Sequence, residues 1–570
     1  FIESKTVRSF VLGFAAGVIG LSLNATLIDV FEASKVAFVL WITTGVVVGG
    51  LSLYQQKEFF IRKEIVKIFS SSYAVLCYLF LLTLVIYSTA LNGYFIGDDF
   101  TWFRWASQCG PECSIPQQIV NYFLNSDGFF YRPGSKIFFL FMYKAFWLNQ
   151  VTYHAVSIVA HFGVVSLLYL LARKIVKNDL LASISACIFV VISGYMEVVL
   201  WVSGIGHIFN ALFMMFGLYT FIKWYEKKKI LFFILSLVSF LAAVTFHELG
   251  IVAPILALAY VLFQSQISKK QIVSMIKTKM YYLLFIPTVA YLLIRLLSDS
   301  HWFNGDYSYD IIKFPFNIVG NIIGYVCITV FGPLSYPAYE LLRQFTRSNI
   351  MAGFILGQVI VGLFYMILRF ISRVFSNHEK KIIIFSSLFF VICLLPFLGL
   401  GNIAFRYSYL SSFGLIMICV LLGQKLYEYL KVFGRTTAVL VIALFFSVFA
   451  LIHIVQAQQA VIEWNGAGEK VEKFLISIDA LYEDAWSNDN VVFYFANVPV
   501  KNNNAWVFPV GIEDALWFAF QNKDIVVNRV PSLSDIDTTI YKSPNTWVFE
   551  FQSDGSVKNV LLSDVTKNND

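Results

Sequence analysis

Charged residues are scarce in this chain of 570 residues. Asp, Glu, Lys and Arg make up 14% of it and hydrophobic residues 58%, whereas an average soluble domain is roughly one quarter charged. The mean hydropathy of +0.72 excludes an ordinary soluble enzyme, a disordered chain and a coiled coil. Apolar runs of roughly 18 residues or more, each long enough to cross a bilayer, recur along most of the chain. The sequence therefore predicts a polytopic membrane protein.

Cysteine is also sparse, with seven residues in all. Five of them fall in apolar segments, where cysteine behaves as a small hydrophobic residue. Cys109 and Cys113 lie together as CGPEC in a long loop and are the one disulfide candidate, provided that this loop is outside the cytoplasm. A zinc site would need two more ligands, and no matching His or Cys pair is nearby. The chain also lacks a Gly-rich phosphate loop after a strand, so nothing predicts a nucleotide site.

Hydropathy predicts about thirteen transmembrane helices and a small C-terminal α/β domain outside the cytoplasm. We divide the chain into an N-terminal hairpin and cytoplasmic loop (1–66), a transmembrane core (67–455) with outer segments 92–150 and 298–349, and an extracytoplasmic domain (456–570). The expected spans are Ser9–Asp29, Ala33–Tyr54, Ile68–Leu91, Val151–Ala172, Leu180–Gly194, Glu197–Ile222, Ile230–Phe246, Ile251–Phe263, Tyr281–Leu297, Ile350–Arg369, Ile382–Leu400, Tyr407–Leu422 and Ala438–Val455.

The Lys and Arg residues behind the net charge of +7 are distributed unequally between the two sides of the membrane. Six alternate connecting segments hold 22 of the 42 Lys and Arg residues, and the positive-inside rule makes them cytoplasmic. The charge therefore predicts the orientation of the chain in a bilayer and does not indicate a nucleic-acid partner. Asn317–Pro333 is apolar enough to span, but counting it as a span would place Arg369 and Lys381 outside. We expect it to be re-entrant or to lie along the membrane.

The C-terminal segment is polar and contains short runs typical of strands at Asn490–Asn497, Asp524–Val530 and Thr546–Phe551. Gly511–Gln521 has a helical pattern, and Asp554-Gly555 between two extended runs indicates a hairpin. The run Asn502–Asn504 with Trp506 and Trp517 would suit sugar binding, although core packing of the aromatic residues is the stronger interpretation.

An acidic pair, Asp98 and Asp99, follows the Ile68–Leu91 span. Two adjacent carboxylates repel each other and lose hydration at a membrane surface, so some compensation is needed. One interpretation is a solvated loop whose Asp caps a helix. The other is a general base with a second carboxylate or metal ligand beside it, acting on a hydroxyl group.

Further ionisable residues lie at or inside the predicted spans, where they are costly and therefore candidates for function. Arg132, after Tyr131, could bind a phosphate through its guanidinium fork or could simply reach the interface. Glu197 is expected to share a helix face with Trp201, with His207 deeper in the same helix. His154 and His161 fit packing better than ligation. Glu197, Glu248, Asp98 and Arg406 should converge at the outer ends of the spans, and the remaining candidates are His247, Arg295 and Tyr407.

Six segments in order resemble the GT-C superfamily of membrane glycosyltransferases. They are FIGDDF, YRPGSKIFFLFMYKAFWLNQVTYHAVSIVAHF, SGYMEVVLWVSGIGHIFNALF, FHELGIVAPIL, VFGPLSYPAYE and FRYSYLSSFGL, over about Ile68–Leu422. The series is most similar to the protein O-mannosyltransferase and tetratricopeptide-repeat O-mannosyltransferase branch. The chain departs from that branch in having His247 where many relatives have lysine and in lacking the repeats, as a prokaryotic envelope member would.

The resemblance implies a sugar donor on polyprenyl phosphate and a protein or glycan acceptor with a free hydroxyl. Asp98 would be the catalytic base, and Asp99 would support it or reach a divalent metal, Mg or Mn, if one is used. Arg132 and Arg406 would bind the donor phosphate. The resemblance also implies a cavity, and it would be lined by Tyr131, His154, Glu197, His207, His247, Glu248 and Tyr407.

Two alternatives remain open at this stage. A lipid or solute transporter would explain the spans and buried charges, but the halves show no similarity and the charges gather at one surface. A non-catalytic scaffold in a complex is the second alternative. The hairpin within residues 9–54 could pack against a membrane protein partner in either case. Release of polyprenyl phosphate would separate an enzyme from both.

Overall fold

The computed structural model describes residues 71–108, 114–126, 130–264, 279–298, 300, 309, 312–487, 490–522 and 524–561. The two predicted spans of the N-terminal hairpin and the Cys109–Cys113 pair lie outside these residues. The other five cysteines are unpaired.

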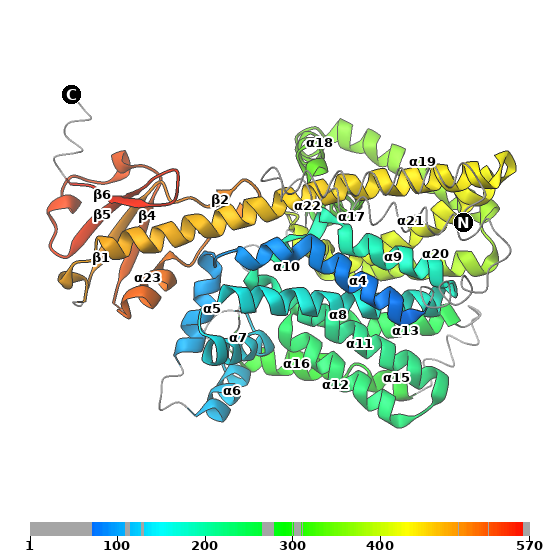
Figure 1. Cartoon of the computed structure of the whole chain (residues 1–570), viewed down its shortest axis with the longest axis horizontal. Coiled ribbons are helices and arrows are strands. Elements are labelled where there is room, and N and C mark those ends of the chain that lie inside the picture. The colour runs from blue at the N-terminus through cyan, green and yellow to red at the C-terminus, as the bar shows by residue number, and fades with distance from the viewer. Residues whose placement is uncertain are drawn as a thin grey trace, which may run out of the picture.

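Helices form the main body, and one small sheet domain lies at its end (Figure 1). The helices are α4 (Ser72–Tyr87), α5 (Gly97–Ser107), α6 (Ile115–Leu124), α7 (Pro133–Phe146), α8 (Gln150–Val176), α9 (Asp179–Val191), α10 (Glu197–Leu200), α11 (Ile205–Lys227), α12 (Ile230–Phe246), α13 (Ala253–Gln264), α15 (Lys279–Leu283), α16 (Ile286–Leu297), α17 (Phe314–Phe331), α18 (Tyr336–Ser348), α19 (Ile350–Val374), α20 (Asn377–Leu394), α21 (Ser408–Leu430), α22 (Arg435–Ala480) and α23 (Ile512–Phe520). The strands are β1 (Val492–Ala496), β2 (Lys501–Asn502), β3 (Ala505–Trp506), β4 (Val526–Val530), β5 (Thr546–Phe551) and β6 (Val557–Asn559).

The polytopic helical fold is confirmed. Within the described part of the chain, nine helical stretches are long and apolar enough to cross a membrane, and three shorter apolar helices accompany them. Every span predicted between residues 68 and 455 corresponds to one of these. One further helix, α17, is not among the predicted spans. It is a single uninterrupted helix of 18 residues with the length and hydropathy of a span.

Polar side chains fix where the apolar helices begin. Asn149 accepts a hydrogen bond from the Thr152 amide at the start of α8, and Asn178 does the same for two amides of α9. These bonds satisfy amides that have no partner within the helix, and Asn is among the residues best suited to this position.

The helix predicted from Glu197 to Ile222 is interrupted, so the expectation that His207 lies in the same helix as Glu197 is wrong. The short α10 ends at Leu200, and Trp201 has an extended ψ of 122° before a 3-10 turn leads into α11. Gly204 packs against the Val198 carbonyl oxygen, and a Cβ at this position would lie 2.8 Å from it. The break separates Glu197 from the long apolar helix and leaves it free to face the C-terminal domain.

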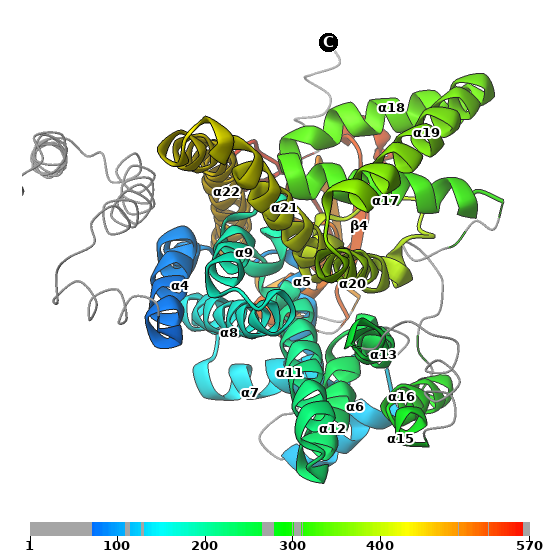
Figure 2. The same ribbon diagram turned by 90° about the vertical axis from the view of Figure 1, so that its right-hand side faces the viewer.

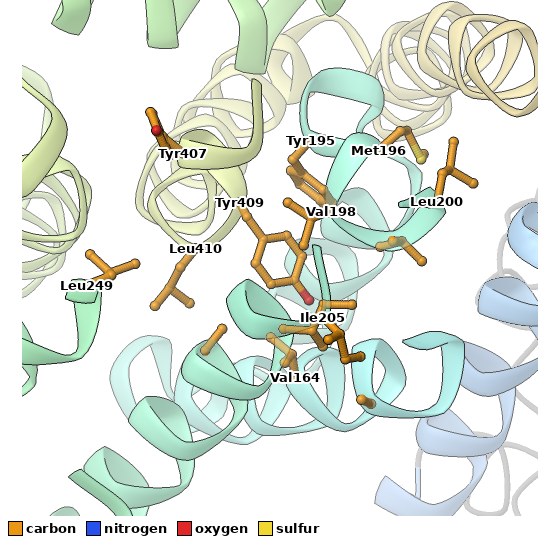
Figure 3. Close-up of a cluster of buried hydrophobic side chains, with 14 of the residues drawn as sticks. Val164, Tyr195, Met196, Val198, Leu200, Ile205, Leu249, Tyr407, Tyr409 and Leu410 are labelled. Carbon is orange, nitrogen blue, oxygen red and sulfur yellow. The ribbon is translucent and has the colours of Figure 1, made fainter. Parts of the chain in front are cut away.

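The core of the bundle packs tyrosines among aliphatic side chains (Figure 3), and it also contains buried histidine. Tyr409 lies at its centre beside Tyr195, and its hydroxyl group is 2.8 Å from Nδ1 of His161. His161 is fully buried and also stacks near Phe189. This residue thus has the packing role predicted for it.

The C-terminal domain is a four-stranded sheet in the order β4-β1-β5-β6. The first three strands are parallel, and β5 and β6 form the antiparallel hairpin predicted at Asp554-Gly555. The 46-residue α22 runs from the far end of the bundle into this domain (Figures 1 and 2). The polar segment after Gln456 therefore begins as a continuation of the last apolar helix.

Candidate functional site

The acidic pair lies where the C-terminal domain meets the helical body. α5 begins at Gly97, whose amide donates to the Val507 carbonyl at 2.9 Å. The approach is so close that a Cβ on Gly97 would lie 2.3 Å from the Val510 carbonyl oxygen. Gly511 faces it with a φ of 89°, a left-handed conformation that glycine adopts without strain. Asp98 and Asp99 therefore occupy the first turn of a helix whose start is covered by Val507–Gly511.

Asp99 is committed to hydrogen bonds within the protein. One carboxylate oxygen accepts from the Ile96 amide at 3.0 Å, and the other accepts from both the amide and the hydroxyl group of Ser203. Burial raises the pKa of Asp99 to about 6, although these donors act in the opposite direction. Asp99 therefore joins α5 to the turn that precedes α11 and holds the start of α5 in place.

Asp98 has a different environment. Within the part of the chain that the structure describes, its Oδ1 atom is buried with no hydrogen-bond partner, while the Val510 backbone contributes a bond to the carboxyl group. Burial and the neighbouring charge of Asp99 raise the pKa of Asp98 to about 7, against the attraction of Arg406. The pair thus divides into a fixed carboxylate and one that keeps a free oxygen.

Arg406, just before α21, forms the second part of the site. Its Nη1 atom is 2.7 Å from Oε1 of Glu197, and its amide donates to Oε2 at 3.2 Å. The guanidinium also lies against the rings of Trp201 and Tyr407, at 5.6 and 5.1 Å. Trp506 of β3 donates its indole N–H to Glu197 at 3.2 Å. The predicted convergence of Glu197 with Arg406 is therefore present, with a third partner from the C-terminal domain.

A second cluster is built around Glu248, which follows α12. Arg132 forms a fork on this carboxylate through Nε and Nη2, at 3.1 and 2.9 Å from Oε2. Arg295 lies 3.8 Å away and His247 3.6 Å away. Tyr131 points elsewhere: it donates to the Phe123 carbonyl and packs on Tyr291. Arg132 thus already has a carboxylate partner, and Tyr131 supports the loop.

His207 and His247 connect the two clusters. Their ring centroids are 4.1 Å apart, and His207 is 6.1 Å from the ring of Tyr407. Tyr407 in turn stacks on Phe397 at 3.9 Å. The charges of both Arg132 and Arg406 act on both histidines. The two arginines predicted to bind phosphate therefore lie on either side of a common histidine pair.

His154 belongs to a small pocket behind the acidic pair. Asp99, Trp201, Trp464 and Asn465 line the same pocket, whose free volume of ≈ 10 Å³ is about that of one water molecule. His154 is 3% exposed, and its ring interacts with the Gly93 backbone. A pocket of this size has no room for a sugar.

The C-terminal domain supplies contacts that the sequence did not indicate. Asp514 of α23 accepts from Thr101 at 2.5 Å and from Arg104 at 2.8 Å. Arg529 donates to the carbonyl groups of Phe508 and Pro509 and lies close enough for the charge of Asp98 to act on it. No local pattern marks these residues, because their partners in α5 are about four hundred positions away. Trp506, for which the sequence favours core packing over sugar binding, donates its indole N–H to Glu197.

The residues at the acidic pair do not fit a metal held by the protein. In the described part of the chain, no group of three or more His, Cys, Asp and Glu side chains is placed to hold one. Mg²⁺ needs an octahedron of oxygen ligands, but both oxygens of Asp99 already accept hydrogen bonds and Asp98 keeps one free oxygen. We therefore derive no step through a metal ion.

Comparison with known proteins gives a structural likeness but no match in sequence. No family model and no curated protein sequence matches the chain. Among solved structures, the crystal structure of ArnT from Cupriavidus metallidurans bound to undecaprenyl phosphate is similar at a TM-score of 0.38 and 10% identity, over 83% of this chain and 93% of that one.

Proposed function

We propose that this protein is an integral membrane glycosyltransferase that moves a sugar from a polyprenyl-phosphate donor to the hydroxyl group of an acceptor. The observation that carries the proposal is Asp98, whose buried Oδ1 atom has no hydrogen-bond partner among the described residues and whose carboxyl group lies within the field of the Arg406 charge. A general base needs a free oxygen and a pKa near the working pH, and Asp98 has both. A scaffold would need neither.

In the proposed reaction, Asp98 takes the proton from the acceptor hydroxyl group as its oxygen attacks the anomeric carbon of the sugar. The bond between that carbon and the phosphate oxygen breaks, and the lipid phosphate leaves with the electron pair. Its charge grows during this step, so the guanidinium of Arg406 stabilises the transition state more than the ground state. Attack opposite the leaving group inverts the configuration.

Glu197 and Trp506 support Arg406 in this scheme. The carboxylate of Glu197 receives both the guanidinium and the amide of Arg406, which fixes the direction of the side chain. Arg132 is paired with Glu248, so we assign it a smaller share of the phosphate binding than Arg406. The side chains of His207 and His247 would line the space between the guanidinium groups of Arg132 and Arg406.

The finer parts of the proposal follow from the sequence. The positive-inside pattern favours a C-terminal domain on the outer face, and the resemblance to prokaryotic envelope members favours the plasma membrane. A donor that carries its own activated phosphate bond suits that side, where nucleotide sugars are absent. The acceptor is a protein or an envelope glycan, in keeping with the resemblance to the O-mannosyltransferase branch.

Transfer and release of polyprenyl phosphate by the purified protein in detergent test the proposal. Asp98→Asn should lower the rate at least about 100-fold, the range of general base catalysis. Asp479→Asn is the matched control, because it removes the same charge from an exposed residue of α22 that makes no contact with the acidic pair. Equal rates for Asp98→Asn and the control would refute the role of Asp98. Absence of lipid phosphate release by the wild type with every donor tried would favour the scaffold.

A further inference from the structure

α17 carries a row of polar side chains that hold the loop before Arg406. Asn317 donates to the Gly399 carbonyl at 3.2 Å, and Asn321 donates to those of Phe397, Leu398 and Leu400 at 3.0 to 3.1 Å. Both asparagines are fully buried. The loop therefore obtains hydrogen bonds from an apolar helix, and these bonds fix its path.

Two arginines of α18 converge on this loop. Arg343 places Nη2 2.9 Å from the Gly401 carbonyl, and Arg347, one turn later, places Nη2 at 3.1 Å from the same oxygen. Both also approach Oδ1 of Asn317, at 3.5 and 2.9 Å. Two positive charges thus share two neutral acceptors.

Neither arginine has a carboxylate partner among the described residues. The nearest acidic side chain on the helix is Glu340, which hydrogen-bonds Gln344 and Tyr336. Arg343 is 3% exposed, and its Nε–H has no acceptor in the part of the chain that the structure describes. A buried cation with an unsatisfied N–H group beside a second cation is costly. An anion between them would supply the missing acceptors and offset the repulsion.

The residues around Arg343 and Arg347 indicate which kind of molecule carries the anion. α18 exposes Leu341, Leu342 and Phe345, so one face is apolar and the other cationic, as in helices that lie in a membrane interface. Directly after Arg347, an open hollow is lined by Ser348, Asn349, Met351 and Phe354. A lipid whose phosphate group binds the two arginines would have an apolar surface beside it for its hydrocarbon chain.

We propose that Arg343 and Arg347 form a binding site for the phosphate group of an anionic bilayer lipid, separate from the reaction centre. The guanidinium forks hold the phosphate oxygens, and the chain of the lipid lies along Met351 and Phe354. Arg343 and Arg347 both donate hydrogen bonds to the carbonyl of Gly401, five residues before Arg406. A bound lipid would therefore also stabilise the loop that leads to the reaction centre.

Photo-crosslinking of the full chain in phosphatidylcholine nanodiscs tests this site without relying on transfer activity. Phosphatidylglycerol with a diazirine on its acyl chain is the probe, and phosphatidylcholine with the same diazirine is the control lipid. The anionic probe should label peptides within residues 336–374, and Arg343→Gln combined with Arg347→Gln should reduce this label about tenfold. Arg373→Gln, an exposed arginine on α19, should not change it.

Equal labelling by the two lipids, or unchanged labelling of the double variant, would overturn the proposal. If the double variant does not give a monodisperse protein, Arg347→Gln alone, which changes a more exposed side chain, should still reduce labelling about threefold. A diazirine-bearing farnesyl phosphate in a second arm identifies the lipid: labelling of the same peptides points to the prenyl donor, and its absence to a glycerophospholipid. Full displacement of the probe by equimolar inorganic phosphate would overturn the lipid assignment.

Discussion

Replacing Asp98 with Asn should remove activity and yet make the protein more stable. Both effects have the same cause, because the proposed base is a carboxylate placed where its charge is poorly solvated. The pKa of Asp98 is about 7, against an ordinary value of 3.8. The folded protein therefore binds the proton of Asp98 more tightly than the unfolded chain does, and the ionised form is the costly one.

The magnitude follows from this difference of about three units. Each unit corresponds to about 1.4 kcal/mol, so ionised Asp98 costs the folded state about 4 kcal/mol above pH 7. The cost shrinks as the pH falls through the folded pKa and vanishes below the unfolded value. Asn carries no charge at any pH and can still accept the bond from the Val510 amide. The gain in stability should therefore be largest at pH 8 and absent near pH 3.8.

Thermal unfolding in detergent, followed for the wild type and Asp98→Asn between pH 5 and 8, measures this gain. The melting temperature of the variant should exceed that of the wild type at pH 8, and the difference should narrow toward pH 5. Asp479→Asn controls for the general effect of removing a negative charge. A variant that is less stable than the wild type at pH 8, or an offset that does not vary with pH, would refute the electrostatic account of Asp98.

Two further predictions concern the same site. Because the base must be ionised, kcat/KM for transfer should rise about tenfold from pH 6 to pH 8, as the ionised fraction of a group with a pKa of about 7 grows from about one tenth to nine tenths; a flat profile would contradict this. Trp506→Phe keeps the aromatic ring but removes the N–H that Glu197 accepts, so transfer should fall about three- to tenfold while the melting temperature stays within about a degree. Trp547→Phe, in β5, controls for loss of an indole in the same domain, and an equal fall in both variants would argue against a role for the bond to Glu197.

The helices could be predicted because a lipid-facing helix must be apolar over its whole length, which leaves a strong signal in the sequence. Asp98 and Arg406 could be found for the converse reason, since a charge near the membrane stands out. The break at Trp201 could not, because Gly204 has no side chain and its close packing on Val198 exists only in the folded state. α17 is excluded from the predicted spans only because of the positive charges in the segment that follows it. Those charges carry no information on the length of the helix.

The role of the C-terminal domain was the hardest feature to predict, and two glycines explain why. A Cβ on Gly511 would lie 2.0 Å from the Gly97 carbonyl oxygen, and one on Gly97 would lie 2.3 Å from that of Val510. The domain can therefore reach Asp98 only if both positions lack a side chain, a requirement that links two residues far apart in the sequence. α22, at 1.5 Å per residue about 70 Å long, carries the domain to this position as one continuous helix. The contact is thus built into the fold, and the environment that raises the pKa of Asp98 depends on a domain that the sequence presents as a separate unit.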